Sequence, residues 1–180
     1  KAFVFIVKKY NAKMEYEKDK ARVVMDGSSQ PGSSFKDTSS RTMNPSTTKL
    51  LFLLAAWRDW NVSSTDIKQA FCLVDQIEPV YVRLPAELWP RFGKYVRLLK
   101  CLYGLRQAAY RFYEEIRGAL IKAGFEVCTH DPALFRYYQN EELVLLVGVH
   151  VDDTLVIAKT PEHRDILVKA LSDRFTEEHV

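Results

Sequence analysis

The chain has few cysteines, no long apolar run and little net charge, and each of these shortages argues against a class of protein. Its three cysteines are widely spaced and form no C-x-x-C pair, which argues against a disulfide framework and against a zinc site. No apolar run is long enough to cross a bilayer, and the apolar start lacks a small-residue cleavage site, so we expect neither a membrane span nor a signal peptide. Reduced thiols indicate an intracellular protein, and a net charge of +3 is compatible with a nucleic-acid partner without requiring one.

Two adjacent aspartates interrupt the most apolar part of the chain. Residues 143–151 and 154–158 are rich in Val and Leu and predict two strands, and Asp152 and Asp153 stand between them, where a tight hairpin turn is expected. Burying unpaired carboxylates is costly, so these two must be hydrated or neutralised. Water hydrates them if the turn is exposed, and a divalent metal neutralises them if the turn is a functional site. Both explanations stay open on these residues alone.

The remaining pattern predicts strands and helices in alternation. A loop is predicted where Ser, Thr, Gly and Pro are dense, over residues 26–48. Helical periodicity predicts three helices: one that begins at Pro45, one over residues 106–123, and one that follows Thr160 as its N-cap. Several predicted strands are separated by hairpin-length connections, such as residues 80–84 and 94–99. The expected fold class is therefore α+β, with a mainly antiparallel sheet and helices packed on one face.

A third carboxylate, Asp66, ends a predicted strand in the stretch "STDIKQAF". An aspartate at a strand end is most often a cap or a turn former, so this stretch by itself is weak evidence for a site. Phe71, five residues later, fits a core aromatic at least as well as a binding residue.

Three stretches together are more specific. The chain contains "TDIKQAF", "LKCLYGLRQAAYRFYEEI" and "VHVDDTLVIA", in that order. This order and spacing resemble the reverse transcriptase of copia-type LTR retrotransposons, whose pattern includes D-V-K-x-A-F, S-L-Y-G-L-K-Q-A-P and Y-V-D-D. The connecting segments "KARVVMDGSSQ", "VYVRLP" and "HDPALF" are similar to family segments as well. The resemblance extends from about Lys20 to Phe175.

The resemblance implies an RNA-directed DNA polymerase with the fingers and palm of a right-hand polymerase. It places a fingers-like part at residues 1–60 and the palm at residues 61–180. A thumb, a connection and an RNase H domain are not within these residues and are expected elsewhere in a larger polyprotein. The implied partners are an RNA or DNA template with its primer and a dNTP, with no membrane. The implied location is the cytoplasm, in a virus-like particle, or the nucleus.

The resemblance also implies roles for individual residues. Asp66 and Asp152 would each coordinate two Mg²⁺ ions, with Mn²⁺ as an alternative, and Asp153 would support the catalytic site. The backbone carbonyl of Ile67 would complete the ion on the nucleotide side. Two such ions stabilise the attacking and leaving oxygens of an in-line phosphoryl transfer. The resemblance further implies a nucleotide-binding set: Phe71 as steric gate, Gly104, Arg106, Gln107 and the fingers residue Arg22.

The chain departs from the family pattern at several positions. His150 replaces the usual Tyr, Ala109 replaces a Pro, and "CLVDQ" replaces a turn containing N-G. The segment "FKDTSSRTMNP" also differs from the family's F-A-P-V stretch. These departures favour an alternative hypothesis, a catalytically degenerate or domesticated nucleic-acid-binding remnant, whereas the three retained acids argue against it. Another two-metal phosphotransferase on a similar palm, such as a nucleotide cyclase, is a third hypothesis, which the "LYGLRQA" and "KARVV" stretches oppose.

Overall fold

The computed structural model describes residues 1–30 and 40–180, which form two compact units that interleave along the chain. The first unit consists of residues 1–38 and 71–108, and the second consists of residues 39–70 and 109–180. Residues 31–39 of the predicted loop over residues 26–48, which include the first five residues of the departing "FKDTSSRTMNP" stretch, lie outside the described residues. The assignment of fingers and palm to residues 1–60 and 61–180 stays a prediction.

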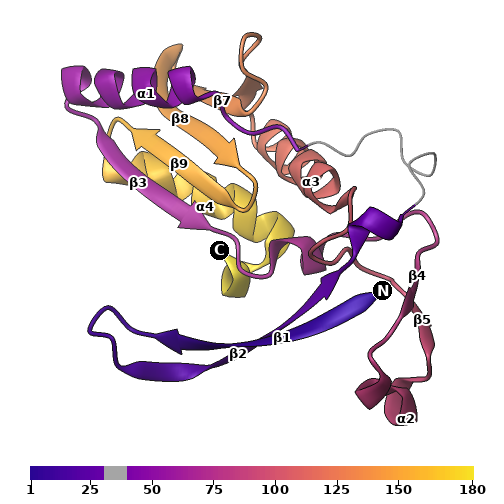
Figure 1. Ribbon diagram of the computed structural model, residues 1–180. Coiled ribbons are helices and arrows are strands. Elements are labelled where there is room, and N and C mark those ends of the chain that lie inside the picture. Colours follow the sequence, from indigo (N-terminus) through magenta and orange to yellow (C-terminus); the bar gives the residue numbers. More distant parts are fainter. Residues whose placement is uncertain (31–39) are drawn as a thin grey trace. The chain divides into compact units, whose positions relative to one another are not determined.

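The first unit contains two antiparallel pairs of strands (Figure 1). The N-terminal residues form a long hairpin of β1 (Ala2–Tyr10) and β2 (Tyr16–Met25). The Asn11 side chain accepts hydrogen bonds from the amides of Lys13 and Glu15 at 2.9 and 3.0 Å and so closes the turn. The predicted second pair forms as β4 (Tyr81–Arg83) and β5 (Tyr95–Arg97), joined through the short helix α2 (Trp89–Phe92).

The second unit is built on a five-stranded sheet with the strand order β3-β9-β8-β7-β6, and every neighbouring pair is antiparallel. The strands are β3 (Asn61–Asp66), β6 (Glu126–Val127), β7 (Leu134–Gln139), β8 (Glu142–His150) and β9 (Asp153–Ala158). The long helices are α1 (Pro45–Arg58), α3 (Ala108–Lys122) and α4 (Pro161–Phe175), followed by the 3-10 turn η5 (Glu177–His179). The predicted antiparallel α+β arrangement is confirmed.

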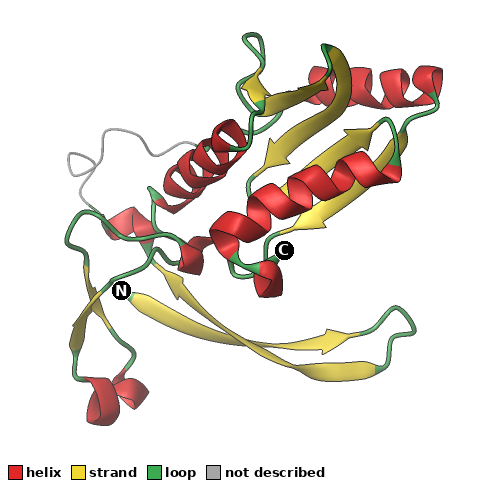
Figure 2. Ribbon diagram, turned by 180° about the vertical axis from the view of Figure 1, so that it is seen from behind, coloured by secondary structure: helices red, strands yellow, loops and turns green. Residues whose placement is uncertain are grey.

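Helices cover both faces of this sheet, which corrects the expectation that they would pack on one face. Leu146 and Ile157 face α1 and form a cluster with its buried Leu51 and Ala55. Helix α4 packs against β8 and β9 on the opposite side, and Phe112 of α3 stacks against Phe175 of α4 with ring centroids 5.6 Å apart. The two views show α1 and α4 on opposite sides of the strands (Figures 1 and 2). The physical reason is that β8 is apolar at nearly every position, so both of its faces need cover.

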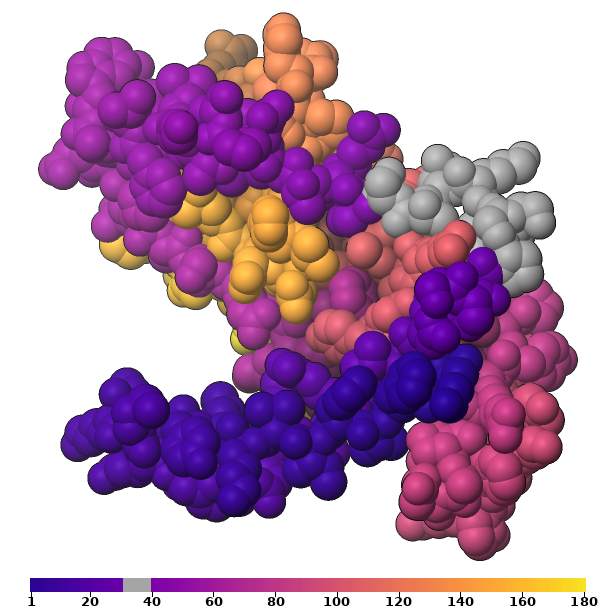
Figure 3. All heavy atoms as spheres, in the orientation of Figure 1, coloured from indigo at the N-terminus to yellow at the C-terminus, as the bar shows by residue number. Residues whose placement is uncertain are grey.

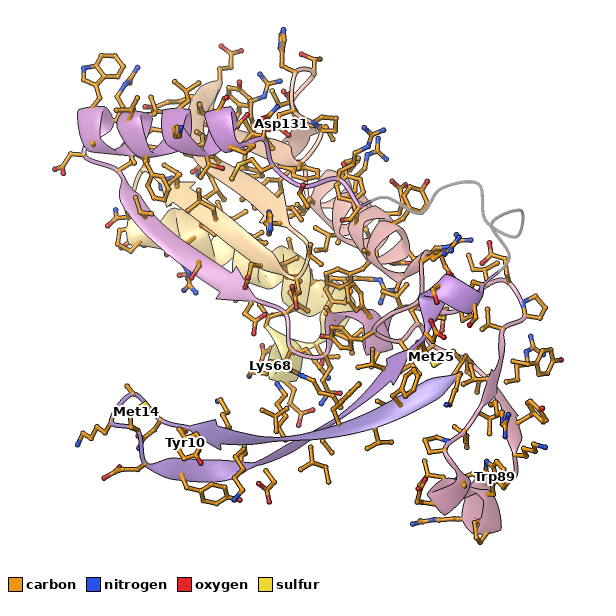
Figure 4. All side chains as sticks on the ribbon, viewed as in Figure 1. Tyr10, Met14, Met25, Lys68, Trp89 and Asp131 are labelled. Carbon is orange, nitrogen blue, oxygen red and sulfur yellow. The ribbon has the colours of Figure 1, made fainter. Side chains whose placement is uncertain are left out.

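Asp131 ties the start of α1 to the sheet (Figure 4). Its side chain is only 6% exposed. One carboxylate oxygen accepts the Asn44 amide at 2.9 Å, and the other accepts the Ala133 amide at 3.1 Å. Asn44 occupies the N-cap position of α1 but makes no side-chain capping bond, so the Asp131 carboxylate supplies an acceptor at this helix end.

We predict that Asp131→Ala lowers the free energy of unfolding by about 3 kcal/mol, because the part-buried Asn44 bond and the buried Ala133 bond both lose their charged acceptor. Urea denaturation monitored by circular dichroism measures the change. Asp165→Ala, which removes an exposed carboxylate of α4, is the matched control and should change stability by less than about 0.5 kcal/mol. Equal losses in the two variants would show that Asp131 does not hold this helix start.

Candidate active site

Three carboxylates gather where β3 ends and the β8–β9 hairpin turns. In the register of the sheet, Asp66 is the partner of Asp153, and Asp153 is in turn the partner of His150. Directly opposite residues of an antiparallel pair project from the same face with Cβ atoms about 5 Å apart. The sheet therefore brings Asp66 and Asp153 together although they are far apart in sequence, and His150 completes a row of three side chains.

Asp152 lies in the hairpin turn itself, which has only Val151 and Asp152 between the paired ends of the two strands. The Ile67 amide donates a hydrogen bond to the Asp152 carbonyl at 3.2 Å, and the Thr154 hydroxyl donates to the Thr65 carbonyl at 3.0 Å. These two bonds fasten the turn to the end of β3. The predicted hairpin is confirmed, but its turn lies one residue earlier than expected, because Asp153 is already part of β9 (Asp153–Ala158).

The turn contains a strained residue. Val151 has a φ angle of +59°. A β-branched side chain is an outlier in this left-handed region, and such strain costs about 1–3 kcal/mol. Hairpin turns of this length favour glycine or asparagine at positions with positive φ, and this chain has valine there.

The three carboxylates are accessible to water, although the strands on either side of the turn are apolar. Asp66 and Asp153 are exposed, and Asp152 is half-buried. The sequence suggested acids at a buried strand end, but the apolar run ends before the turn, so water can hydrate these side chains.

The donor chemistry fits Mg²⁺ with substrate phosphates present. Mg²⁺ prefers oxygen ligands and is usually held by one or two carboxylates together with phosphates and water, not by a cage of protein groups alone. Asp66 and Asp153 offer carboxylate oxygens from one face, and Asp152 offers a third carboxylate from the adjoining turn. Over residues 1–30 and 40–180, no group of three or more His, Cys, Asp and Glu side chains is arranged to hold a metal by itself.

The segment after Asp66 is held by the C-terminal turn η5. The Lys68 amide donates to the His179 carbonyl at 2.8 Å, and the Lys68 ammonium group lies 3.4 Å from the Glu178 carbonyl (Figure 4). Thr176 Oγ1 and His179 Nδ1 form a further hydrogen bond of 3.0 Å within this turn. Sequence reasoning missed this contact, since no local pattern links residues so far apart along the chain.

The residues expected to bind nucleotide belong to the first unit. Arg22 is exposed on β2, where its register partner is Phe5. Phe71 is 8% exposed and meets Tyr103 edge to face, with ring centroids 4.6 Å apart. Phe71 is therefore a packed aromatic in this structure, and its role as a steric gate stays a prediction.

Gly104 is required by a close approach of two backbone segments. Its φ is +88°, and a Cβ there would lie 2.0 Å from the Met25 carbonyl oxygen. A Cβ on Gly27 would similarly lie 2.2 Å from the Gly104 carbonyl oxygen, and the Met25 amide donates to the Tyr103 carbonyl at 2.7 Å. The resemblance implies that Gly104 binds nucleotide, which stays a prediction, and the group that approaches Gly104 in this structure is the protein's own chain.

Arg106 and Gln107 also bond to protein groups. Arg106 donates from Nε to the Gly27 carbonyl at 2.8 Å and from Nη2 to the Ser28 carbonyl at 3.2 Å. Gln107 is 1% exposed, accepts from the Gln30 amide at 3.3 Å and donates to Gln76 Oε1 at 3.2 Å. These bonds join Arg106 and Gln107 to residues 27–30 and to Gln76 within the first unit, so both residues have a structural role whatever else they bind.

Comparison with known proteins identifies the class of this domain. The family model described as reverse transcriptase (RNA-dependent DNA polymerase) matches residues 1–178. The chain therefore belongs to the reverse transcriptase family.

The relatives are retrotransposon proteins. The chain is 31% identical over 172 residues to the Retrovirus-related Pol polyprotein from transposon RE1 of Arabidopsis thaliana. This alignment covers 94% of this chain and 12% of that polyprotein. It is 30% identical over 145 residues to the Pol polyprotein from transposon TNT 1-94 of Nicotiana tabacum (78% of this chain, 11% of the polyprotein). It is 30% identical over 142 residues to the Ty1-BL Gag-Pol polyprotein of Saccharomyces cerevisiae (78% of this chain, 8% of the polyprotein). The copia-type resemblance is confirmed.

The chain spans about one eighth or less of the length of these relatives. No solved structure matches it. In the described part of the chain, no helix is both long enough and apolar enough to cross a membrane.

We predict that Val151→Gly raises the free energy of unfolding by about 0.5–1 kcal/mol, because glycine adopts a positive φ without strain. Chemical denaturation measures the shift. Val62→Gly, at an exposed position within β3, is the control and should lower stability by about 1 kcal/mol, since strand glycines are unfavourable. If Val151→Gly lowered the free energy of unfolding as much as Val62→Gly does, the conclusion that Val151 is strained would be wrong.

Proposed function

We propose that this chain is the catalytic core of an RNA-directed DNA polymerase encoded within a retrotransposon polyprotein. On this proposal it joins a dNTP to a primer 3′-hydroxyl on an RNA or DNA template, and residues 61–180 serve as the palm. The observation that carries the proposal is the register that pairs Asp66 with Asp153 beside the Asp152 turn. Family membership supplies the reaction type.

The three acids have distinct tasks in this proposal. Asp66 and Asp152 hold the ions and Asp153 supports them, while Ile67, whose amide is fixed on the Asp152 carbonyl, contributes its own carbonyl oxygen. Mg²⁺ ions in such a site lower the pKa of the attacking hydroxyl and stabilise charge on the leaving oxygen. The protein's part is to hold the carboxylates at one strand end and keep them open to the phosphates, and their exposure supports this role.

The alternative is a remnant that binds nucleic acid without turnover. His150 favours it, because this side chain stands in the row with Asp66 and Asp153 where the family pattern has tyrosine. Retention of all three acids in a connected geometry favours the polymerase.

Primer extension on an RNA template with Mg²⁺ tests the proposal, with this chain and with a longer polyprotein segment that contains it. We predict that Asp66→Asn and Asp152→Asn each lower incorporation by at least about a hundredfold, since each removes charge that offsets the developing charge of phosphoryl transfer. Asp165→Asn, an exposed carboxylate on α4, is the matched control and should retain activity.

Incorporation that is unchanged in both site variants would contradict the assignment of the carboxylates. If the unaltered chain and the longer segment both bind primer-template but extend nothing, the remnant hypothesis replaces the polymerase.

Phe71 offers a separate test in an active preparation. We predict that Phe71→Val increases the use of ribonucleotides relative to deoxyribonucleotides by at least about tenfold, because a smaller side chain no longer excludes a 2′-hydroxyl. Steady-state incorporation of matched nucleotide pairs measures the ratio. Tyr103→Phe, which preserves the ring that packs against Phe71, is the control. An unchanged ratio in a folded Phe71→Val variant would leave Phe71 with a packing role only.

A further inference from the structure

An exposed ribbon of the first unit is far more basic than the chain as a whole. This ribbon, residues 80–99, contains β4, β5 and α2, and its atoms lie at the surface in the space-filling view (Figure 3). It has four basic residues against one acidic residue, whereas the whole chain has 26 against 23. The basic residues are Arg83, Arg91, Lys94 and Arg97, and the acidic residue is Glu87. Four aromatic residues, Tyr81, Trp89, Phe92 and Tyr95, are interspersed with them.

The strand register arranges tyrosine and arginine alternately on one face of the ribbon. Tyr81 is the partner of Arg97, and Arg83 is the partner of Tyr95. Since alternate residues of a strand share a face, these four side chains project together. The intervening Val82 points the other way and is 1% exposed, while Tyr81 and Tyr95 are 69% and 61% exposed. The ribbon thus has a buried apolar face and an open face of tyrosine and arginine.

Cations of the ribbon, including both arginines of the open face, are available to a ligand. The Arg83 guanidinium lies 5.6 Å from the Trp89 ring centroid, and the Lys94 ammonium group lies 5.4 Å from the same ring. Trp89 is itself fixed, because its indole N–H donates to the Leu84 carbonyl at 2.8 Å (Figure 4). Among the residues that the structure describes, no carboxylate forms an ion pair with these two cations or with Arg97. Their charge is therefore not neutralised within the described part of the chain.

We propose that the open face of the β4–β5 ribbon binds single-stranded nucleic acid. Phosphates are bound by the arginines, and unpaired bases stack on the tyrosine rings, the combination by which proteins hold single strands without reading sequence. The phosphates of a duplex would pair with the cations, but its bases are stacked and could not stack on the tyrosine rings. An acidic protein segment would also pair with the cations and has no bases to stack on the rings. The proposal concerns a binding surface apart from the carboxylates, and it holds or fails whether or not the chain polymerises DNA.

Fluorescence anisotropy with a labelled twelve-nucleotide oligo-dT tests the surface, in EDTA and without dNTPs so that catalysis does not enter. We expect Tyr81→Leu/Tyr95→Leu to weaken binding about tenfold or more, whereas Tyr81→Phe/Tyr95→Phe, which keeps both rings, retains affinity. Arg83→Gln/Arg97→Gln should weaken binding and reduce the slope of log K against log salt by about 1.4, or about 0.7 per lost phosphate contact. Lys122→Gln/Lys169→Gln removes the same charge from exposed sites on α3 and α4 and should leave the slope unchanged.

Wild-type affinity and slope in both ribbon variants would overturn the proposal. A loss in the arginine variant with none in the leucine variant would also overturn it, because charge alone would then account for binding, as for a duplex or an acidic protein. Thermal unfolding by circular dichroism confirms that each variant is folded. If a double variant unfolds, the single Tyr81→Leu and Arg97→Gln changes, both at exposed positions, take its place with the same criteria.

Discussion

The antiparallel register of β3 with β9 is the constraint on which the second unit and its candidate site depend. Because side chains alternate with a period of two, a shift by one residue would turn every side chain of β3 to the other face. Asp66 would then leave the row it shares with Asp153 and His150. The Thr154–Thr65 and Ile67–Asp152 hydrogen bonds fix this register at the end where the acids lie.

That register also holds like charges together. Directly opposed carboxylates destabilise a strand pair, typically by up to about 1 kcal/mol, and here exposure to water reduces the repulsion. A strained valine in the adjoining turn adds a second local cost. Residues chosen only for stability would avoid both, and natural proteins concentrate such conflicts at functional sites.

Local pattern was enough to predict most elements and the hairpin of acids, but it did not predict how the helices share the sheet. The apolar run of β8 predicted a strand correctly, and its lack of alternation is typical of a strand buried on both faces, which the expectation of helices on one face did not take into account. In α1 nearly every residue of the central turns is apolar, so periodicity could not decide which face is buried. The structure buries Leu51 and leaves Trp57 75% exposed.

The parts that sequence could not supply are contacts between distant residues. Gln107 was singled out by its motif, but its burial depends on Gln30 and Gln76, which lie 77 and 31 residues away. The η5 turn that holds Lys68 likewise has no local signal. Gly104 is an intermediate case, since the need for a residue without Cβ was predictable while its neighbour, the Met25 carbonyl, was not.

An open cluster of acids suits a site completed by its substrate. A set of carboxylates buried deeply enough to bind an ion unaided would also bind it when no triphosphate is present, and would leave little room for phosphate oxygens in the coordination shell. The arrangement of Asp66 and Asp153 on one face, with Asp152 in the turn beside them, leaves that shell unfinished. On the proposed function, the nucleotide and primer would supply the remaining oxygen ligands, so these carboxylates would hold an ion tightly only with substrate correctly placed.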